Sequence, residues 1–166
     1  MAITILFGVP LVVALGFLGF FSYPYFWDCS KTKPKDNDLV GSYRVLKLRL
    51  PSELKREAKE KEARITLNAD HTAILADVPE FDGFGQKLEC RLSGSATWEL
   101  DDMANDGLGW DVTFHYHSTS KVTIPNCKYE NSIFAILILS RHAPYRLYDI
   151  VGDPDSDTGI EYERLN

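Results

Sequence analysis

The chain of 166 residues is long enough for one domain and a short additional segment. Its formal net charge is −6, and every charged side chain lies at or after Asp28. Because phosphates need cationic partners, an acidic chain without a stripe of lysine and arginine does not suit nucleic-acid binding. Aromatic residues make up 12% of the chain, which favours strands over helices.

Residues 1–27 contain no charged side chain and are apolar on all sides. As a helix this segment would be about 40 Å long, enough to cross a hydrocarbon core of about 30 Å with some tilt. Its last residues would form an interfacial aromatic belt: Tyr23, Tyr25, Phe26 and Trp27. We therefore expect residues 1–27 to form a single transmembrane helix that anchors the chain.

Two other interpretations of this segment are weaker. A cleaved signal peptide needs a basic start, which is missing, and a small-residue cleavage site, for which Ala14-Leu15-Gly16 is a loose match. A lipoprotein signal ending at Cys29 would need small residues before that cysteine, whereas large and acidic ones precede it.

The side of the membrane is indicated by two opposing signals. Lys31, Lys33 and Lys35 follow the apolar segment, which favours a cytoplasmic domain. Cys90 and Cys127 can instead pair as one disulfide in an oxidising compartment. Since the short N-terminus gives the charge rule little to compare, we expect the extracytoplasmic side and keep the cytoplasmic side open.

The first half of the remaining chain predicts strands around one helix. Residues 28–38 are typical of a polar linker, and residues 39–166 of a β domain. The domain begins with a strand over Leu39–Leu50, a surface helix over Ser52–Ala63 capped by Ser52, and a hairpin over Arg64–Val78. Residues 79–94, with three glycines, predict a long loop or an irregular edge.

The second half continues with alternating apolar and polar residues. The predicted strands are Ser95–Leu100, Trp110–His117, a short one at Lys121–Ile124, Ile133–Leu139 covered on both faces, and a closing hairpin of Tyr145–Val151 with Ile160–Leu165. About eight strands joined by short turns favour an antiparallel meander that closes as a barrel or folds as a sandwich.

Three stretches resemble the lipocalin-like (calycin) family, especially small bacterial membrane-anchored domains. They are Asp38-Leu39-Val40-Gly41-Ser42-Tyr43, Ile65-Thr66-Leu67-Asn68-Ala69-Asp70-His71-Thr72, and the segment from Tyr145 to Arg164. The resemblance implies a mostly β, lipocalin-like barrel with one short surface helix. It also implies that Arg164 packs over Tyr43, which replaces the family's tryptophan, by a cation–π contact. It does not transfer a ligand.

Several side chains are candidates for a site. Five inward aromatic residues line a cavity or fill a core: Tyr43, Trp98, Trp110, Phe114 and Tyr116. Asp153, Asp155 and Asp157 have the spacing of a calcium loop, but the glycine comes one position late and Arg164 replaces the bidentate glutamate. His115 and His117 lie about 7 Å apart on one strand face, too few ligands for zinc. We expect a plain turn, exposed histidines and no cofactor.

The sequence lacks the motifs of the common enzymes. It contains no Gly-x-Ser-x-Gly, no phosphate loop and no His-Glu-x-x-His. The leading hypothesis is a membrane-tethered, non-enzymatic module that binds a protein partner through loops or a strand edge, as an inhibitor or immunity protein would. One alternative is a carrier of a small apolar ligand or lipid. Another is a hydrolase in the barrel mouth, which requires polar groups that converge on a cleft.

Overall fold

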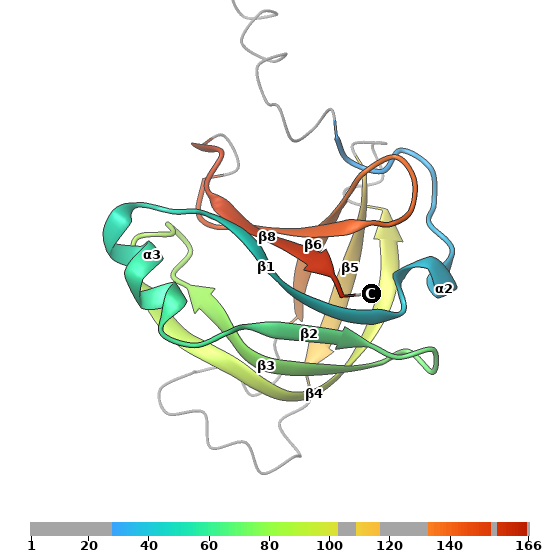
Figure 1. Ribbon diagram of the computed structural model, residues 1–166, viewed down its shortest axis with the longest axis horizontal. Coiled ribbons are helices and arrows are strands. Elements are labelled where there is room, and N and C mark those ends of the chain that lie inside the picture. Colours follow the sequence, from blue (N-terminus) through green and yellow to red (C-terminus); the bar gives the residue numbers. More distant parts are fainter. Residues whose placement is uncertain (1–27, 103–108, 117–132, 154–155, 166) are drawn as a thin grey trace, which may run out of the picture.

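The computed structural model describes residues 28–102, 109–116, 133–153 and 156–165, and within them the chain is mostly β (Figure 1). Eight antiparallel strands follow in chain order, and β8 pairs back onto β1 to close a barrel. This confirms the predicted meander. The strands are β1 Gly41–Arg49, β2 Arg64–Leu67, β3 Thr72–Phe81, β4 Leu88–Asp102, β5 Trp110–Tyr116, β6 Ile133–Leu139, β7 Arg146–Ile150 and β8 Gly159–Arg164.

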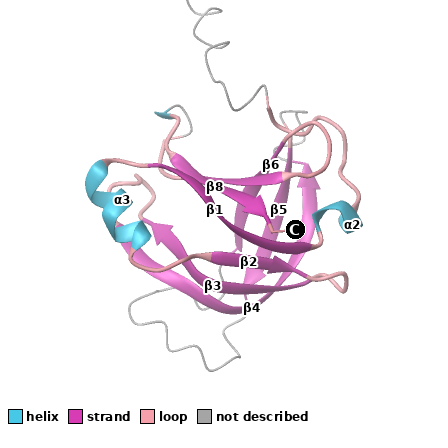
Figure 2. Cartoon of the chain, viewed as in Figure 1, coloured by secondary structure: helices cyan, strands magenta, loops and turns pink. Residues whose placement is uncertain are grey.

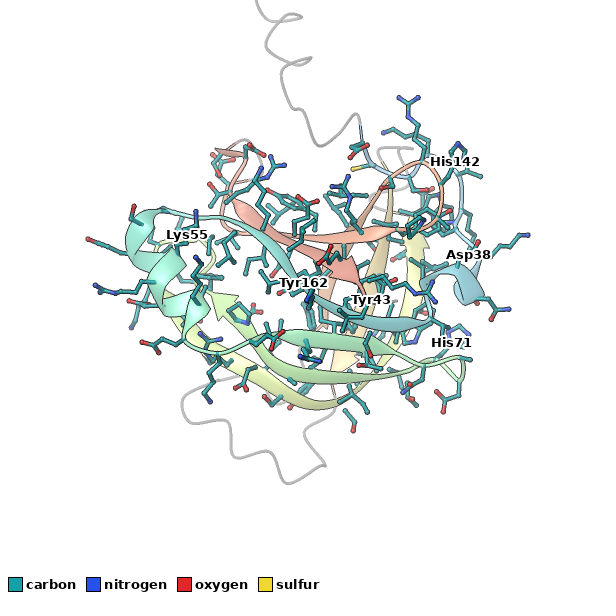
Figure 3. All side chains as sticks on the ribbon, in the orientation of Figure 1. Asp38, Tyr43, Lys55, His71, His142 and Tyr162 are labelled. Carbon is teal, nitrogen blue, oxygen red and sulfur yellow. The ribbon has the colours of Figure 1, made fainter. Side chains whose placement is uncertain are left out.

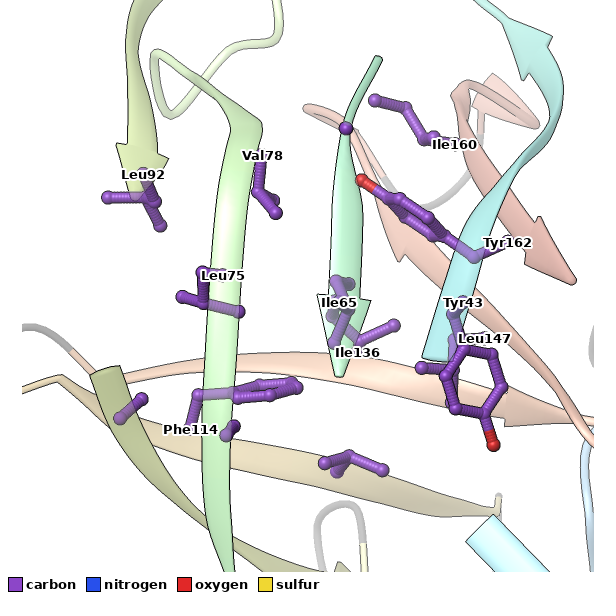
Figure 4. Packing of buried hydrophobic residues seen from close by; sticks show 14 of the residues in the cluster. Tyr43, Ile65, Leu75, Val78, Leu92, Phe114, Ile136, Leu147, Ile160 and Tyr162 are labelled. Atoms are coloured by element: carbon purple, nitrogen blue, oxygen red, sulfur yellow. The ribbon is translucent and has the colours of Figure 1, made fainter. Parts of the chain in front are cut away.

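The barrel interior is filled by the apolar faces of these strands (Figure 4). Side chains at alternate positions point inward, and many of them are completely buried, including Tyr43, Ile65, Phe114, Ile136 and Tyr162. A side chain that borders an internal cavity large enough for water has some accessible surface. These residues have none, so they do not border such a cavity. The described core therefore leaves little room for an enclosed ligand.

The prediction of a loop over residues 79–94 is wrong. β3 and β4 run through this region as a long hairpin whose turn covers residues 82–87. The register shifts twice, between Leu75 and Val78 and between Glu80 and Phe81. Each shift is a bulge that moves side chains to the other face, so the sequence loses the strict alternation from which strands are predicted.

Two short helices accompany the described strands where the sequence predicts one (Figure 2). Helix α3, Ser52–Lys59, begins where expected but ends before Ala63, and its Leu54 and Ala58 pack into the core. The predicted cap by Ser52 is wrong, because Pro51 is the N-cap residue and no side chain caps this end. Helix α2, Asp36–Leu39, lies in the segment that was predicted as a linker.

The start of that linker segment lies against the barrel. Cys29 and Ser30 are fully buried, Cys29 pairs with Leu139, and the Ser30 amide donates to the Ile138 carbonyl at 3.0 Å. Cys29 also packs on the outer side of β6 and β7 with Leu137, Leu139 and Tyr148. Strand β6 is therefore covered on both faces, as its continuous apolar run predicts.

The contact that the lipocalin resemblance implies takes another form here. Arg164 is the register partner of Tyr43, but its guanidinium lies against Gly41 and donates to the Asp38 carbonyl at 3.0 Å. The Tyr43 hydroxyl donates to the Leu39 carbonyl at 2.8 Å. Arg164 therefore closes the start of β1 through hydrogen bonding to the backbone.

Some predictions concern residues that are not described. The strand at Lys121–Ile124 and the transmembrane helix over residues 1–27 lie outside the described residues. Among the residues that are described, the two helices are too short and too polar to span a bilayer.

Candidate functional site

A pocket of about 220 Å³ is lined by the end of β3, the β3–β4 turn and the segment after β7. These segments lie at the end of the barrel that α3 also occupies (Figure 1). Three acidic residues contribute to its walls. The lining residues are Glu80, Phe81, Asp82, Gly83, Asp149, Ile150, Val151 and Gly152.

Two glycines allow the loops around the pocket to touch. Gly85 and Gly152 have φ of +64° and +77°, a left-handed conformation that residues with a side chain rarely adopt. A Cβ atom on Gly152 would lie 2.6 Å from the Phe84 carbonyl oxygen, and one on Gly85 would lie 2.9 Å from the Gly152 backbone. The pocket wall therefore depends on a backbone contact that glycine alone permits.

Replacing Gly152 by alanine is expected to destabilise the protein by roughly 1–3 kcal/mol, because the new Cβ strains the backbone and meets a carbonyl oxygen. Gly83→Ala is the matched control, since a Cβ at Gly83 has no atom within 4 Å and would change stability little. Urea unfolding of both variants measures the difference. Equal effects would show that the two loops do not pack as described.

The carboxyl groups of Glu80 and Asp149, in the pocket walls, are partly desolvated. Burial, followed by the neighbouring Glu89, raises the pKa of Glu80 to about 7. Burial, followed by Glu80, raises the pKa of Asp149 well above its ordinary value. Among the described residues, neither carboxyl has an ion-pair partner or accepts a hydrogen bond from a side chain. The pair is therefore ready to receive a cation or a hydrogen-bond donor.

A buried tyrosine hydroxyl lies close to these carboxyl groups. Tyr162 is 0% exposed, and its hydroxyl has no hydrogen-bond partner in the described part of the chain. Burial raises its pKa, and Asp149 and Glu80 raise it further. Figure 4 shows this hydroxyl pointing away from Tyr43. A buried hydroxyl without a hydrogen-bond partner costs about 1–3 kcal/mol, so such a group needs an explanation. A ligand that binds in the neighbouring pocket would provide one.

A cation whose charge reaches this cluster, Arg91, forms its hydrogen bonds elsewhere. Arg91 on β4 lowers the pKa of Tyr162, so its charge reaches the cluster. Its guanidinium donates to the Asp77 carbonyl at 3.1 Å and to the Glu57 carbonyl of α3. These bonds hold it between the β3 bulge and α3, and they leave the two carboxyl groups without a pair.

An exposed aromatic ring stands beside the pocket. Phe84, in the β3–β4 turn, is 81% exposed, and its carbonyl touches Gly152 in the pocket wall. Aromatic side chains that anchor protein interfaces are large, apolar and accessible before binding. Phe84 and the acidic pocket together offer one apolar and one anionic contact at the same end of the barrel.

The aromatic residues that the sequence singles out lie elsewhere. Tyr43, Trp98, Phe114 and Tyr116 are buried in the core, and the Trp98 indole donates to the Asn68 carbonyl at 3.0 Å. Trp110 packs at the edge of this core, with the Lys33 ammonium 5.1 Å from the centre of its ring. None of the five lines the acidic pocket.

The metal candidates do not form a site among the described residues. The Nε2 of His115 lies 2.7 Å from Glu99, and Asp157 accepts two bonds from the Arg49 guanidinium at 2.8 and 2.9 Å. The Asp153 carbonyl accepts a hydrogen bond from the Ser156 amide at 2.9 Å. The buried Cys90 is disulfide-bonded. Its predicted partner Cys127 lies outside the described residues, as do His117 and Asp155. No group of three or more metal-ligating side chains occurs in the described part.

Sequence reasoning missed both carboxyl groups of the pocket. Glu80 stands in a segment that the sequence predicts as a loop, where a glutamate is unremarkable. Asp149 gives a clearer signal, because it shares the inward face of β7 with the buried Leu147. An acidic residue at an inward position of a strand is rare enough to mark a candidate site.

Comparisons of the chain with known protein families, with curated proteins and with solved structures found no match.

Proposed function

We propose that the chain is a membrane-tethered, non-enzymatic module that binds a basic segment of a protein partner at the acidic pocket. The observation that carries the proposal is the pair of half-buried carboxyl groups in the pocket wall, Glu80 and Asp149, without an internal cation among the described residues. A lysine or arginine side chain entering the pocket would supply the missing charge. Phe84 would pack against an apolar neighbour of that basic residue.

Binding of a cation at this site is coupled to proton release. With a pKa of about 7, the Glu80 carboxyl is about half protonated at neutral pH, and burial also raises the pKa of Asp149. An incoming cation favours the ionised form, lowers both pKa values and displaces protons. Affinity for a basic segment therefore rises as the pH increases through about 7, the pKa of Glu80.

The pocket also bears on the two alternative functions. A hydrolase needs polar groups on a cleft, and this pair supplies them, but acid–base catalysis by two carboxyls keeps one of them ionised. Here burial raises the pKa of both carboxyls, which disfavours keeping one of them ionised. The pair therefore suits binding better than acid–base catalysis. A carrier of an apolar ligand needs a cavity inside the barrel, where this protein has tightly packed rings such as Phe114 and Phe134, 4.6 Å apart.

The tether rests on the sequence of residues 1–27, which are uncharged and long enough to cross a bilayer as a helix. The full-length chain is expected to stay in the membrane fraction after an alkaline carbonate wash, whereas a chain that begins at Asp28 is released. Release of the intact full-length chain by the wash would rule out the anchor.

A displayed library of random peptides tests the proposed partner chemistry, with the full-length chain in non-ionic detergent as bait. We expect enrichment of peptides with lysine or arginine next to an aromatic or aliphatic residue. The double variant Glu80→Gln, Asp149→Asn should weaken binding of the selected peptides by roughly tenfold or more, because two charge-assisted contacts are lost.

Two matched variants separate the site from general stickiness. Phe84→Ser should weaken binding, whereas Ile74→Ser, which removes an exposed apolar residue on β3 outside the pocket, should not. Selected peptides that bind the wild type and the double variant equally well would refute the proposal.

A further inference from the structure

A second groove, separate from the acidic pocket, lies between β1 and α3. Its volume is about 480 Å³, within the range of ligand sites in proteins. The chain leaves β1, passes through α3 and returns towards β2, and the groove lies between the outgoing and returning segments. It is lined by Val45, Leu46, Lys47, Leu48, Lys55, Ala58, Lys59, Lys61, Glu62 and Ala63.

One wall of this groove is an open strand edge. β1 pairs with β8 as far as Arg49 but with β2 only over Gly41–Arg44. Within the described part of the chain, no further backbone hydrogen bond closes the β2 side of the residues after Arg44 in β1. Such an edge can pair with an added extended segment, which is how several domains recognise peptides.

The floor of the groove offers apolar contacts. Ala58 and Ala63 are buried in the core, and Leu46 is an exposed apolar residue, 47% accessible, where the β1–β8 register shifts. Lysines on a bare edge discourage pairing with another sheet. Protection of a strand edge by lysines does not require a groove. The open edge of β1, however, lies beside a groove with an apolar floor.

The rim of the groove is strongly basic. Four lysines stand against one glutamate, Glu62, which pairs with Arg64 at 3.1 Å. Lys61 pairs with Asp77 at 3.1 Å, and the other three form no ion pair among the described residues: Lys47, Lys55 and Lys59. Lys55 projects from α3 at the end of the barrel away from Asp38 and His71 (Figure 3). In an acidic chain this local excess of positive charge selects an acidic ligand.

We propose that this groove binds an extended acidic segment of a partner protein, added as a strand to the open edge of β1 with its carboxylates against the lysines. The open edge favours a peptide over an anionic lipid headgroup, because a headgroup has no backbone amides to pair with the strand. The proposal does not depend on the acidic pocket, since the two sites share no lining residue.

Fluorescence anisotropy with the full-length chain in non-ionic detergent tests this inference. The probe is a labelled heptapeptide of alternating glutamate and valine, and a second probe carries N-methyl groups on the amides that would face β1. We expect saturable binding of the first probe and roughly tenfold weaker binding of the second, because N-methylation removes the pairing donors.

Matched variants test whether the peptide binds in the groove. Lys55→Glu with Lys59→Glu should weaken binding of the peptide by roughly tenfold or more, whereas Lys35→Glu with Lys87→Glu, of equal charge but outside the groove, should change it less than about twofold. Circular dichroism confirms that both double variants fold, since all four lysines are exposed.

Three results with the peptides would each overturn the proposal. They are an absence of saturable binding, equal binding of the N-methylated and unmethylated peptides, or equal loss in the two lysine pairs. Short-chain dihexanoyl phosphatidylglycerol serves as the competing lipid probe. If this lipid binds and its binding alone is lost in the α3 variant, the occupant of the groove is an anionic lipid and the peptide proposal fails.

Discussion

Replacing Glu80 by glutamine is expected to flatten the dependence of stability on pH. In the wild type, the folded state holds a proton on Glu80 up to a pH of about 7, whereas the unfolded chain releases it near the ordinary value of 4.5. Between these values the folded state binds more protons, so the free energy of unfolding falls as the pH rises. Glutamine does not titrate, so the variant does not lose stability through this group as the pH rises.

The size of the effect follows from the pKa. The free energy of unfolding of Glu80→Gln, measured relative to wild type, should increase by about 2–3 kcal/mol between pH 5 and pH 8. Urea unfolding of residues 28–166 at four pH values measures it. Glu53→Gln, which removes an exposed carboxyl on α3, is the control for loss of a glutamate at the surface and should change stability little. Parallel curves for wild type and Glu80→Gln would show that Glu80 is well solvated.

Replacing Arg146 by methionine is expected to lower the free energy of unfolding by about 3 kcal/mol. The Arg146 guanidinium donates to Glu161 and, at 2.7 Å, to Asp28. Glu161 is 2% exposed, and among the described residues the ion-pair partner that it keeps without Arg146 is Arg49 at 3.8 Å. Loss of one partner leaves a buried carboxylate poorly compensated, and it also frees the segment that covers the outer side of β6.

An exposed ion pair provides the comparison for this variant. Arg44 pairs with Glu163 at 2.8 Å near the surface, so Arg44→Met should cost less than about 1 kcal/mol. Urea unfolding of both variants at neutral pH gives the two values. If Arg44→Met costs as much as Arg146→Met, burial of Glu161 is not the source of the effect.

The sequence was sufficient to predict the barrel because several stretches, such as Trp110–Tyr116, alternate apolar and polar residues, and short turns join the strands. β5 and β6 begin and end within one residue of their predicted bounds, and the apolar run of β6 indicated a strand covered on both faces. The β3–β4 hairpin was missed where bulges shift the register, since alternation is the only signal for a short strand. Burial of Cys29 and Ser30 was missed because a short polar segment has no period.

The candidate site could not be predicted from the sequence, for a related reason. Glu80 and Asp149 are far apart in the chain and belong to strands that do not pair with each other. Their approach depends on closure of the barrel, on the bulge beside Glu80 and on the glycine contact between Gly85 and Gly152. The lysine groove similarly depends on where β2 stops pairing with β1.

We propose that Glu80 stands, half-buried, in an acidic pocket that accepts a cation. Carbon-13 NMR of the Glu80 carboxyl, titrated with and without a lysine-containing peptide selected by display, tests it most directly. The account predicts a pKa of about 7 for the free protein and a fall of roughly one unit or more when the peptide binds. A pKa near 4.5, or a raised value that the bound peptide leaves unchanged, would contradict it.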